Sequence, residues 1–170
     1  AELKKWKTDG QLFLAQWEKE QPIDNRIWEN DLVLGNPEAP IRITIACNPY
    51  CGPCAKAHEQ LDELLNKYPN EIRVTVRLLS NSNSPTNKLT IAVKAILQNS
   101  LRPLNNDVKI MLHDWFQLMN LQKWSEKWPP HKCATDVNNL IDMNNQWFEE
   151  NNIKFTPTLF INGKKMPGRY

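Results

Sequence analysis

Apolar and polar residues alternate in two segments of the first half of the chain, and this pattern predicts two β-strands. The segments are Ile41–Cys47 and Glu71–Leu79, with apolar side chains at every second position. Leu32–Leu34 predicts a short edge strand that ends in the turn sequence Gly35-Asn36-Pro37. The segment Phe155-Thr-Pro-Thr-Leu-Phe-Ile-Asn-Gly163 returns to strand character and ends in an Asn-Gly pair that is typical of a hairpin.

Apolar residues at helical spacing occupy most of the remaining chain. Residues 8–21 predict a helix that ends before Pro22, and a second helix is predicted from the end of the first strand segment to Tyr68. After the breaker sequence Asn81-Ser-Asn-Ser-Pro85 comes a long helical block. Its apolar positions are Leu89, Ala92, Val93, Ile96, Leu97, Val108, Met111, Leu112, Trp115, Met119, Trp124, Trp128, Leu140, Met143, Trp147 and Phe148.

The order of these elements indicates an α/β protein with one main domain. We predict that residues 1–31 form an N-terminal helical extension or linker and that residues 32–170 form the domain. A helical insert of about residues 84–152 separates the second predicted strand from the segment that contains Thr156 and Pro157.

Composition limits the classes of function. A hydrophobic content of 41% and seven tryptophans are enough for a packed core, and four cysteines are too few for a disulfide-stapled scaffold of 170 residues. The net charge of +2, without a basic run, gives no reason to expect a nucleic-acid partner. No stretch approaches the roughly 20 apolar residues of a membrane span. The chain begins at Ala1, so we expect a mature product or excised domain from which a targeting or membrane segment is missing.

The sequence Cys51-Gly-Pro-Cys54 stands between a predicted strand and a predicted helix. This position brings the first cysteine to the helix N-terminus, where unpaired N–H groups and the helix dipole stabilise a thiolate. Gly52 is expected to allow a tight turn, and Pro53 suits the first helical turn because its missing N–H is not needed there. Since Cys54 follows by three residues on the same helix face, the two sulfurs can close a disulfide. The motif predicts a site of dithiol–disulfide exchange.

These cysteines have four other interpretations. A structural disulfide closes a very small loop and stabilises little, and a tetrahedral zinc site needs two further ligands that no second motif supplies. Cys47, Cys51 and Cys54 also have the C-x3-C-x2-C spacing that holds iron–sulfur clusters in radical enzymes, which is a second hypothesis. A third hypothesis is a redox-inert interaction module with the same α/β fold, in which Cys51 and Cys54 take no part in exchange.

The run Cys47-Asn-Pro-Tyr-Cys51-Gly-Pro-Cys54-Ala-Lys-Ala-His58, together with the Thr156-Pro157 segment, resembles thioredoxin-like domains of Dsb-type disulfide oxidoreductases. More narrowly, it is similar to the soluble domain fused to vitamin K epoxide reductase-type membrane proteins of Bacteroidetes-like bacteria. The resemblance covers residue 32 to the C-terminus and implies a thioredoxin fold with a helical insertion.

The resemblance also implies roles and a location. Cys51 and Cys54 are catalytic, and Gly52, Pro53, Thr156 and Pro157 form the substrate-docking surface, with Pro157 in a cis peptide facing the cysteines. The substrates are cysteine-containing proteins, the location is periplasmic with a membrane tether, and a quinone-linked membrane partner exchanges electrons with the site. No metal or organic cofactor is expected. That partner implies an oxidant, whereas the Gly-Pro dipeptide is typical of reducing thioredoxins, so the direction stays open.

Departures from the family pattern affect proton transfer. Thioredoxins have a buried carboxylate six residues before the first cysteine and a proline five residues after the second, where this chain has Ile45 and Glu59. Lys56 and His58 are the candidates for a proton relay, although helical geometry places His58 about 10 Å from Cys51 along the axis. We expect Cys47 to be a buried apolar residue and Cys133 a loop or helix-start cysteine.

Overall fold

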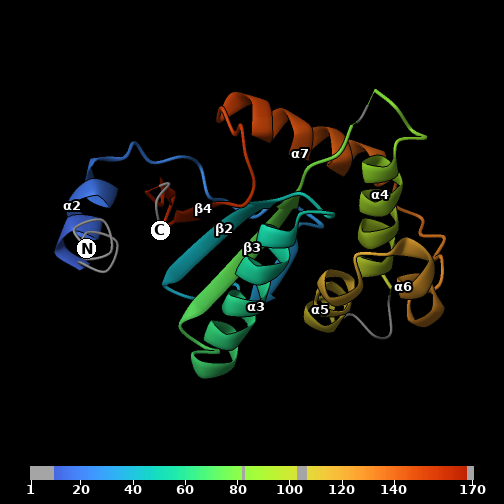
Figure 1. Ribbon diagram of the computed structural model, residues 1–170, viewed down its shortest axis with the longest axis horizontal. Helices are drawn as coiled ribbons and strands as arrows, with labels where there is room; N and C mark the ends of the chain where they lie inside the picture. The colour runs from blue at the N-terminus through green and yellow to red at the C-terminus, as the bar shows by residue number, and fades with distance from the viewer. Residues whose placement is uncertain (1–9, 82, 103–106, 168–170) are drawn as a thin grey trace.

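The computed structural model describes residues 10–81, 83–102 and 107–167 of the chain (Figure 1). Its helices are α2 (Gly10–Lys19), α3 (Gly52–Lys67), α4 (Lys88–Ser100), α5 (Val108–Leu118), α6 (Leu121–Lys127) and α7 (Asn138–Glu150). Its strands are β1 (Leu32–Gly35), β2 (Ile41–Cys47), β3 (Ile72–Leu78), β4 (Thr158–Ile161) and β5 (Lys164–Lys165). The predicted α/β class and the insert of helices between β3 and β4 are confirmed. The predicted first helix is α2, except that residues 8 and 9 lie outside the described residues.

The strands form one sheet in the order β1-β3-β2-β4-β5. The two central strands, β2 and β3, run parallel because α3 connects them by a crossover, whereas β1 and β4 pair antiparallel at their outer sides. Asn162 and Gly163 both have positive φ and link β4 to β5, so the hairpin predicted from the Asn-Gly pair is confirmed. In this order, the C-terminal end of β2 lies next to the start of β4.

Helices cover both faces of the sheet. Ile45 and Cys47 of β2 belong to the main core with α3, α4 and α5, while Ala46 packs with Trp147 and Phe148 of α7 in a second cluster. Figure 1 shows α3 in front of the sheet and α7 along one end of it. All seven residues of β3 are buried, so both faces of this strand are covered. The alternation seen in the sequence therefore distinguishes one covered face from the other, and not a core face from a solvent face.

Arg77, a buried polar residue of β3, contacts the N-terminal part of the chain. Arg77 is 1% exposed, and its Nη2 donates a hydrogen bond of 2.8 Å to Asp31, which is also buried. Its guanidinium carbon lies 3.4 Å from the ring centroid of Trp28 and 4.9 Å from that of Trp147. Residues 28–31 therefore contact the sheet directly, and the proposed division of the chain at residue 31 remains a prediction.

A helix that crosses a membrane must be both long and apolar. Within the residues that the structure describes, none of the helices is both long and apolar enough to cross a membrane.

Candidate active site

Cys51 caps the N-terminus of α3. Its backbone is extended (φ −97°, ψ 119°), and its carbonyl oxygen accepts the first helical hydrogen bond, from Ala55 N, at 3.1 Å. Pro53 lies in the first turn, as predicted, because a helix start needs no N–H at that position. Gly52 differs from the expectation: its φ lies outside the left-handed region, and a Cβ added to it meets no atom within 4 Å. The turn therefore does not require glycine.

Three sulfur atoms gather where β2 meets α3. Cys51 is partly exposed, whereas Cys54 and Cys47 are 0% exposed and belong to the same core cluster. Cys47 has the largest effect on Cys54, whose pKa it lowers, and Cys54 in turn raises the pKa of Cys47. Cys51 and Cys54 are both free thiols, so the structure represents the reduced site. A small reagent in solution can therefore reach Cys51 and not Cys54.

The pKa values of Cys51 and Cys54 shift in opposite directions, and the predicted thiolate at Cys51 stays a prediction. The hydrogen bond from Cys47, followed by bonds from the Asn48 backbone N–H, Cys51 and Thr156, overcomes burial and lowers the pKa of Cys54 to about 6. Burial, and then the neighbouring Cys54, raise the pKa of Cys51 above its ordinary value, although the Cys54 backbone N–H opposes this. Because the two sulfurs share one proton equilibrium, ionisation of Cys54 holds the proton on Cys51.

The peptide bond between Thr156 and Pro157 is cis and lies beside the cysteine pair, as predicted. The thiol of Cys51 donates a hydrogen bond of 3.6 Å to the carbonyl oxygen of Thr156, and the Thr156 side chain lowers the pKa of both cysteines. Thr156 immediately precedes β4, whose pairing with β2 brings it to this edge of the sheet. Both Thr156 and Pro157 are partly exposed, next to the exposed ring of Phe155.

A family model described as thioredoxin matches residues 28–169. The chain belongs to this thioredoxin family. The match spans both the cysteine pair and the Thr156-Pro157 segment, so the elements that meet at the site are those of the family fold.

Solved structures share this thioredoxin-family fold at low sequence identity. A periplasmic thioredoxin-like protein from Salmonella enterica serovar Typhimurium is 15% identical, with 96% of this chain and 91% of that chain covered and a TM-score of 0.66. BdbD from Bacillus subtilis is 13% identical, with coverage of 88% and 89% and a TM-score of 0.65. DsbA from Chlamydia trachomatis is 17% identical, with coverage of 86% and 88% and a TM-score of 0.62. No curated protein sequence matches the chain.

Trp115 of the helical insert supports the loop before the thioredoxin-family cysteine pair. Its Nε1 donates a hydrogen bond of 2.7 Å to the carbonyl oxygen of Pro49, and its ring meets that of Tyr50 edge-on, with centroids 5.5 Å apart. Asn48 closes the same loop, since its side chain accepts from Tyr50 N at 2.9 Å. Helical spacing predicted a core position for Trp115, which is correct, but no local signal indicates that its indole N–H holds this loop.

The two candidates for a proton relay lie differently from each other. His58 is 1% exposed and packs on the ring of Phe116, with centroids 4.8 Å apart. Its Nε2 is 3.7 Å from Asp62, whose other carboxylate oxygen is 3.1 Å from His113, and burial lowers the pKa of His58. Lys56 is exposed on the first turns of α3. A relay role for either residue remains a prediction.

Cys133 lies apart from the dithiol. Cys133 is a free, partly exposed thiol that donates a hydrogen bond of 3.1 Å to Thr135 O.

The iron–sulfur hypothesis needs Cys47, Cys51 and Cys54 as joint ligands of one cluster. In the described part of the chain, no three Cys, His, Asp or Glu residues have an arrangement that could hold a metal ion, so the structure does not support this hypothesis.

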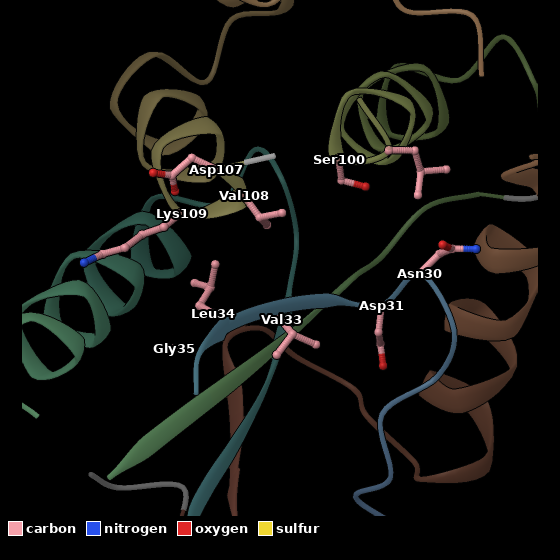
Figure 2. Close-up of a pocket in the computed structure, with 10 residues that line it drawn as sticks. Asn30, Asp31, Val33, Leu34, Gly35, Ser100, Asp107, Val108 and Lys109 are labelled. Atoms are coloured by element: carbon pink, nitrogen blue, oxygen red, sulfur yellow. The ribbon is translucent and has the colours of Figure 1, made fainter. Parts of the chain in front are cut away.

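A hollow of about 430 Å³ lies beside the edge strand β1, and Figure 2 shows the side chains that line it. Val33 and Leu34 line its floor, and Ser100, Val108 and Lys109 line it from the helical insert. None of the four cysteines lines this hollow. The hollow is therefore separate from the cysteine cluster.

Proposed function

We propose that the protein is a thiol–disulfide oxidoreductase that exchanges disulfides with cysteine-containing proteins through Cys51 and Cys54. One observation supports this most strongly: a reachable sulfur, Cys51, lies between a buried partner sulfur and the partly exposed backbone of Thr156. A redox-inert module with the same fold has no need for a lowered Cys54 pKa, which requires several converging donors.

The oxidising reaction follows from exposure and charge. In the oxidised protein, a client thiolate attacks the sulfur of Cys51, because Cys54 is buried. The Cys51–Cys54 bond breaks, a mixed disulfide forms at Cys51, and Cys54 leaves as a thiolate. A thiol of lower pKa leaves faster. A second client thiolate then attacks the client sulfur of the mixed disulfide, the client disulfide forms, and Cys51 leaves and takes up a proton. Two electrons pass from client to protein.

The same features favour the oxidising direction. A stabilised Cys54 thiolate lowers the free energy of the reduced protein relative to the disulfide form, which raises the reduction potential. The raised pKa of Cys51 makes it a weak initial nucleophile toward client disulfides at neutral pH. The Gly-Pro dipeptide is typical of reducing thioredoxins and argues for the opposite direction.

Thr156, Pro157, Gly52 and Pro53 form the docking surface of this proposal. Gly52 and Pro53 are exposed beside Cys51, and the open space at Gly52 allows a client chain to approach the sulfur closely. The partly exposed backbone of Thr156 is suited to pair with an extended client segment, in the manner of strand addition.

We further propose a periplasmic location, a membrane tether and a quinone-linked membrane partner that reoxidises Cys51 and Cys54. The support is the resemblance of the cysteine motif to domains fused to vitamin K epoxide reductase-type proteins, and the description of a structural neighbour from Salmonella as periplasmic. The electrons reside in the dithiol, so the proposed reaction uses no metal or organic cofactor.

Titration of the unmutated protein against glutathione, together with trapping of clients, tests the function. We expect Cys51→Ser to abolish exchange and Cys54→Ser to accumulate mixed disulfides, which non-reducing electrophoresis detects. Cys133→Ser serves as the matched control and is expected to leave exchange unchanged. Failure of the unmutated protein either to oxidise a reduced client or to reduce an insulin-type disulfide would favour the redox-inert module instead.

A further inference from the structure

Acidic residues are absent from the three chain segments that contribute side chains around Cys51. The chain contains 19 acidic residues, but none of them lies within residues 39–58, 72–106 or 151–170. These segments include the loop and helix start around Cys51, the start of α4, and the Thr156-Pro157 segment with β4 and β5. The chain as a whole has a net charge of only +2, so its carboxylates are concentrated away from the reachable thiol.

Lys88 lies beside the aromatic ring next to Cys51. Its ammonium nitrogen is 4.0 Å from the ring centroid of Tyr50, the residue that immediately precedes Cys51. The Tyr50 ring is itself held in place, because it meets the ring of Trp115 edge-on at 5.5 Å and Trp115 donates to Pro49 O. Lys88 is exposed and is the first residue of α4. The helical insert thus places one ammonium group at the loop that carries the cysteine pair.

Lys165 places a second ammonium group beside the other segment that contacts Cys51. Its nitrogen lies 5.4 Å from the ring centroid of Phe155, which is 62% exposed. Phe155 immediately precedes Thr156, whose carbonyl oxygen is 3.6 Å from the sulfur of Cys51. The backbone of Lys165 is fixed by its antiparallel pairing with Phe160. The two ammonium groups therefore reach the site from separate parts of the sequence.

Both ammonium groups remain available to an anionic ligand. Among the residues that the structure describes, none of the ion pairs includes Lys88 or Lys165. An aromatic ring has no net charge, so a cation–π contact orients an ammonium group without neutralising it. We use the term cationic rim for Lys88 and Lys165 together with the rings of Tyr50 and Phe155.

We propose that the cationic rim selects clients in which acidic side chains flank the reacting cysteine. This inference rests on the proposed exchange function and names its substrate class. A client segment that extends along Thr156 advances about 3.3 Å per residue, so side chains within a few positions of the client cysteine come close to the rim. A carboxylate there meets an opposite charge, whereas a lysine meets a like charge. Such charges act mainly on specificity and on the rate of association.

Three synthetic peptides with the same cysteine pair, flanked by Glu, by Gln or by Lys, test this selection. The rate constant of each reduced peptide with the oxidised protein is divided by its rate constant with hydroxyethyl disulfide, which is small and uncharged. This division is needed because the flanking charges also shift the pKa of the peptide thiol. At low ionic strength we expect the Glu peptide to react about tenfold faster than the Lys peptide, with the Gln peptide between them. At 1 M salt, where the Debye length is about 3 Å, the ratio should fall to about two or less.

The double variant Lys88→Gln/Lys165→Gln removes both charges and should bring the three normalised rates to within about twofold of one another. Lys67→Gln is the matched control, because Lys67 lies 5.5 Å from the Tyr68 ring centroid and forms the same kind of pair at the far end of α3. The control should keep the selectivity of the unmutated protein. Equal normalised rates for the three peptides in the unmutated protein, or an equal loss of selectivity in the control, would overturn the proposal.

Peptides with serine in place of cysteine separate failure of this proposal from failure of the exchange function, because their binding needs no reaction. We expect the Glu peptide to bind more tightly than the Lys peptide in NMR titrations, with the largest amide shifts around Tyr50 and Phe155. Equal binding of the two peptides contradicts the role of the rim, whereas absence of exchange with every cysteine peptide contradicts only the exchange function. Tighter binding to vesicles that contain an anionic lipid than to the Glu peptide would assign the rim to a membrane surface and overturn the proposal.

Discussion

The sulfur of Cys51 lies 3.6 Å from the carbonyl oxygen of Thr156, a residue 105 positions further along the chain. The antiparallel pairing of β2 with β4 brings the two residues together, while the helical insert between them folds away to cover the sheet. The reachable sulfur therefore lies beside a backbone segment that a client can approach. This relationship links the chemistry of the dithiol to the place where a client chain is expected to bind.

The reduction potential is expected to depend on pH with a change of slope near pH 6. Below this value both sulfurs take up a proton on reduction, whereas above it Cys54 remains a thiolate and only one proton is taken up. The potential should fall by about 59 mV per pH unit below the break and by about 30 mV above it. Equilibration with glutathione buffers over this range measures both slopes, and a single slope of two protons up to pH 8 contradicts the assignment.

The lowered pKa of Cys54 also affects the free energy of unfolding. The unfolded chain holds the Cys54 proton up to about pH 9, whereas the folded, reduced protein releases it at about pH 6. Between these values the unfolded state binds more protons, so the free energy of unfolding of the reduced protein should rise with pH. This contribution is lost as the pH falls through about 6. Urea unfolding of the reduced and the disulfide forms at several pH values isolates it, because the disulfide form lacks this titration.

Thr156→Val should raise the pKa of both active-site cysteines. Valine keeps the shape of threonine but lacks the hydroxyl of the side chain that lowers the pKa of both cysteines. Thr158→Val is the matched control, since the Thr158 hydroxyl donates to Phe155 O at 2.6 Å and not to a sulfur. Titration of the thiolate absorbance is expected to shift upward by a few tenths of a pH unit only in Thr156→Val. Equal shifts in both variants indicate a general loosening of the segment.

Ile45→Asp should raise the pKa of Cys51 and slow its alkylation at neutral pH. Ile45 lies on the same sheet face as Cys47 and in the same core cluster as Cys54, so an ionised carboxylate there repels a thiolate. Ile43→Asp introduces the same charge into the same cluster two residues further from the site and should have a smaller effect. Rates with a small alkylating reagent, measured on folded protein, provide the comparison. An unchanged or lowered Cys51 pKa in Ile45→Asp shows that position 45 does not act on the sulfurs.

Asp31→Ala should destabilise the protein by about 3–5 kcal/mol, because it leaves the buried charge of Arg77 without its partner. Asp24→Ala is the matched control: it breaks the Arg26–Asp24 pair, which is exposed and should contribute nothing measurable. Chemical denaturation of both variants gives the difference. Similar stabilities for the two variants contradict the interpretation that residues near 31 are part of the folded domain.

Phe155→Ala should weaken reaction with protein clients about fivefold in kcat/KM while leaving reaction with a small thiol reagent unchanged. The ring is 62% exposed and immediately precedes Thr156, so it can contact a client but does not reach the sulfurs through any hydrogen bond. Tyr68→Ala, at the far end of α3, removes an aromatic ring that is 41% exposed and is the control. A loss of the same size toward both kinds of substrate shows that Phe155 supports the site itself and not docking.

The sequence alone determined the elements and the identity of the exchange motif. Alternation over Ile41–Cys47 and Glu71–Leu79 predicted β2 and β3, and the Cys51-Gly-Pro-Cys54 context predicted a cysteine at a helix start. These features depend on neighbours a few residues away, because strand and helix periodicities and helix capping are local. The cis peptide before Pro157 was predicted as well, through the resemblance of its segment to the family.

Only the tertiary structure decided which sulfur is exposed and which groups surround the pair. The low pKa of Cys54 depends on a thiol from β2, a backbone N–H from the loop before α3 and a hydroxyl that precedes β4. The support of Pro49 by Trp115 and the burial of Arg77 between Trp28 and Trp147 likewise join distant segments. A pKa responds to every donor and charge within a few ångströms of the group, whatever its position in the chain. Local spacing therefore predicted the dithiol, but the packing of three chain segments set its charge.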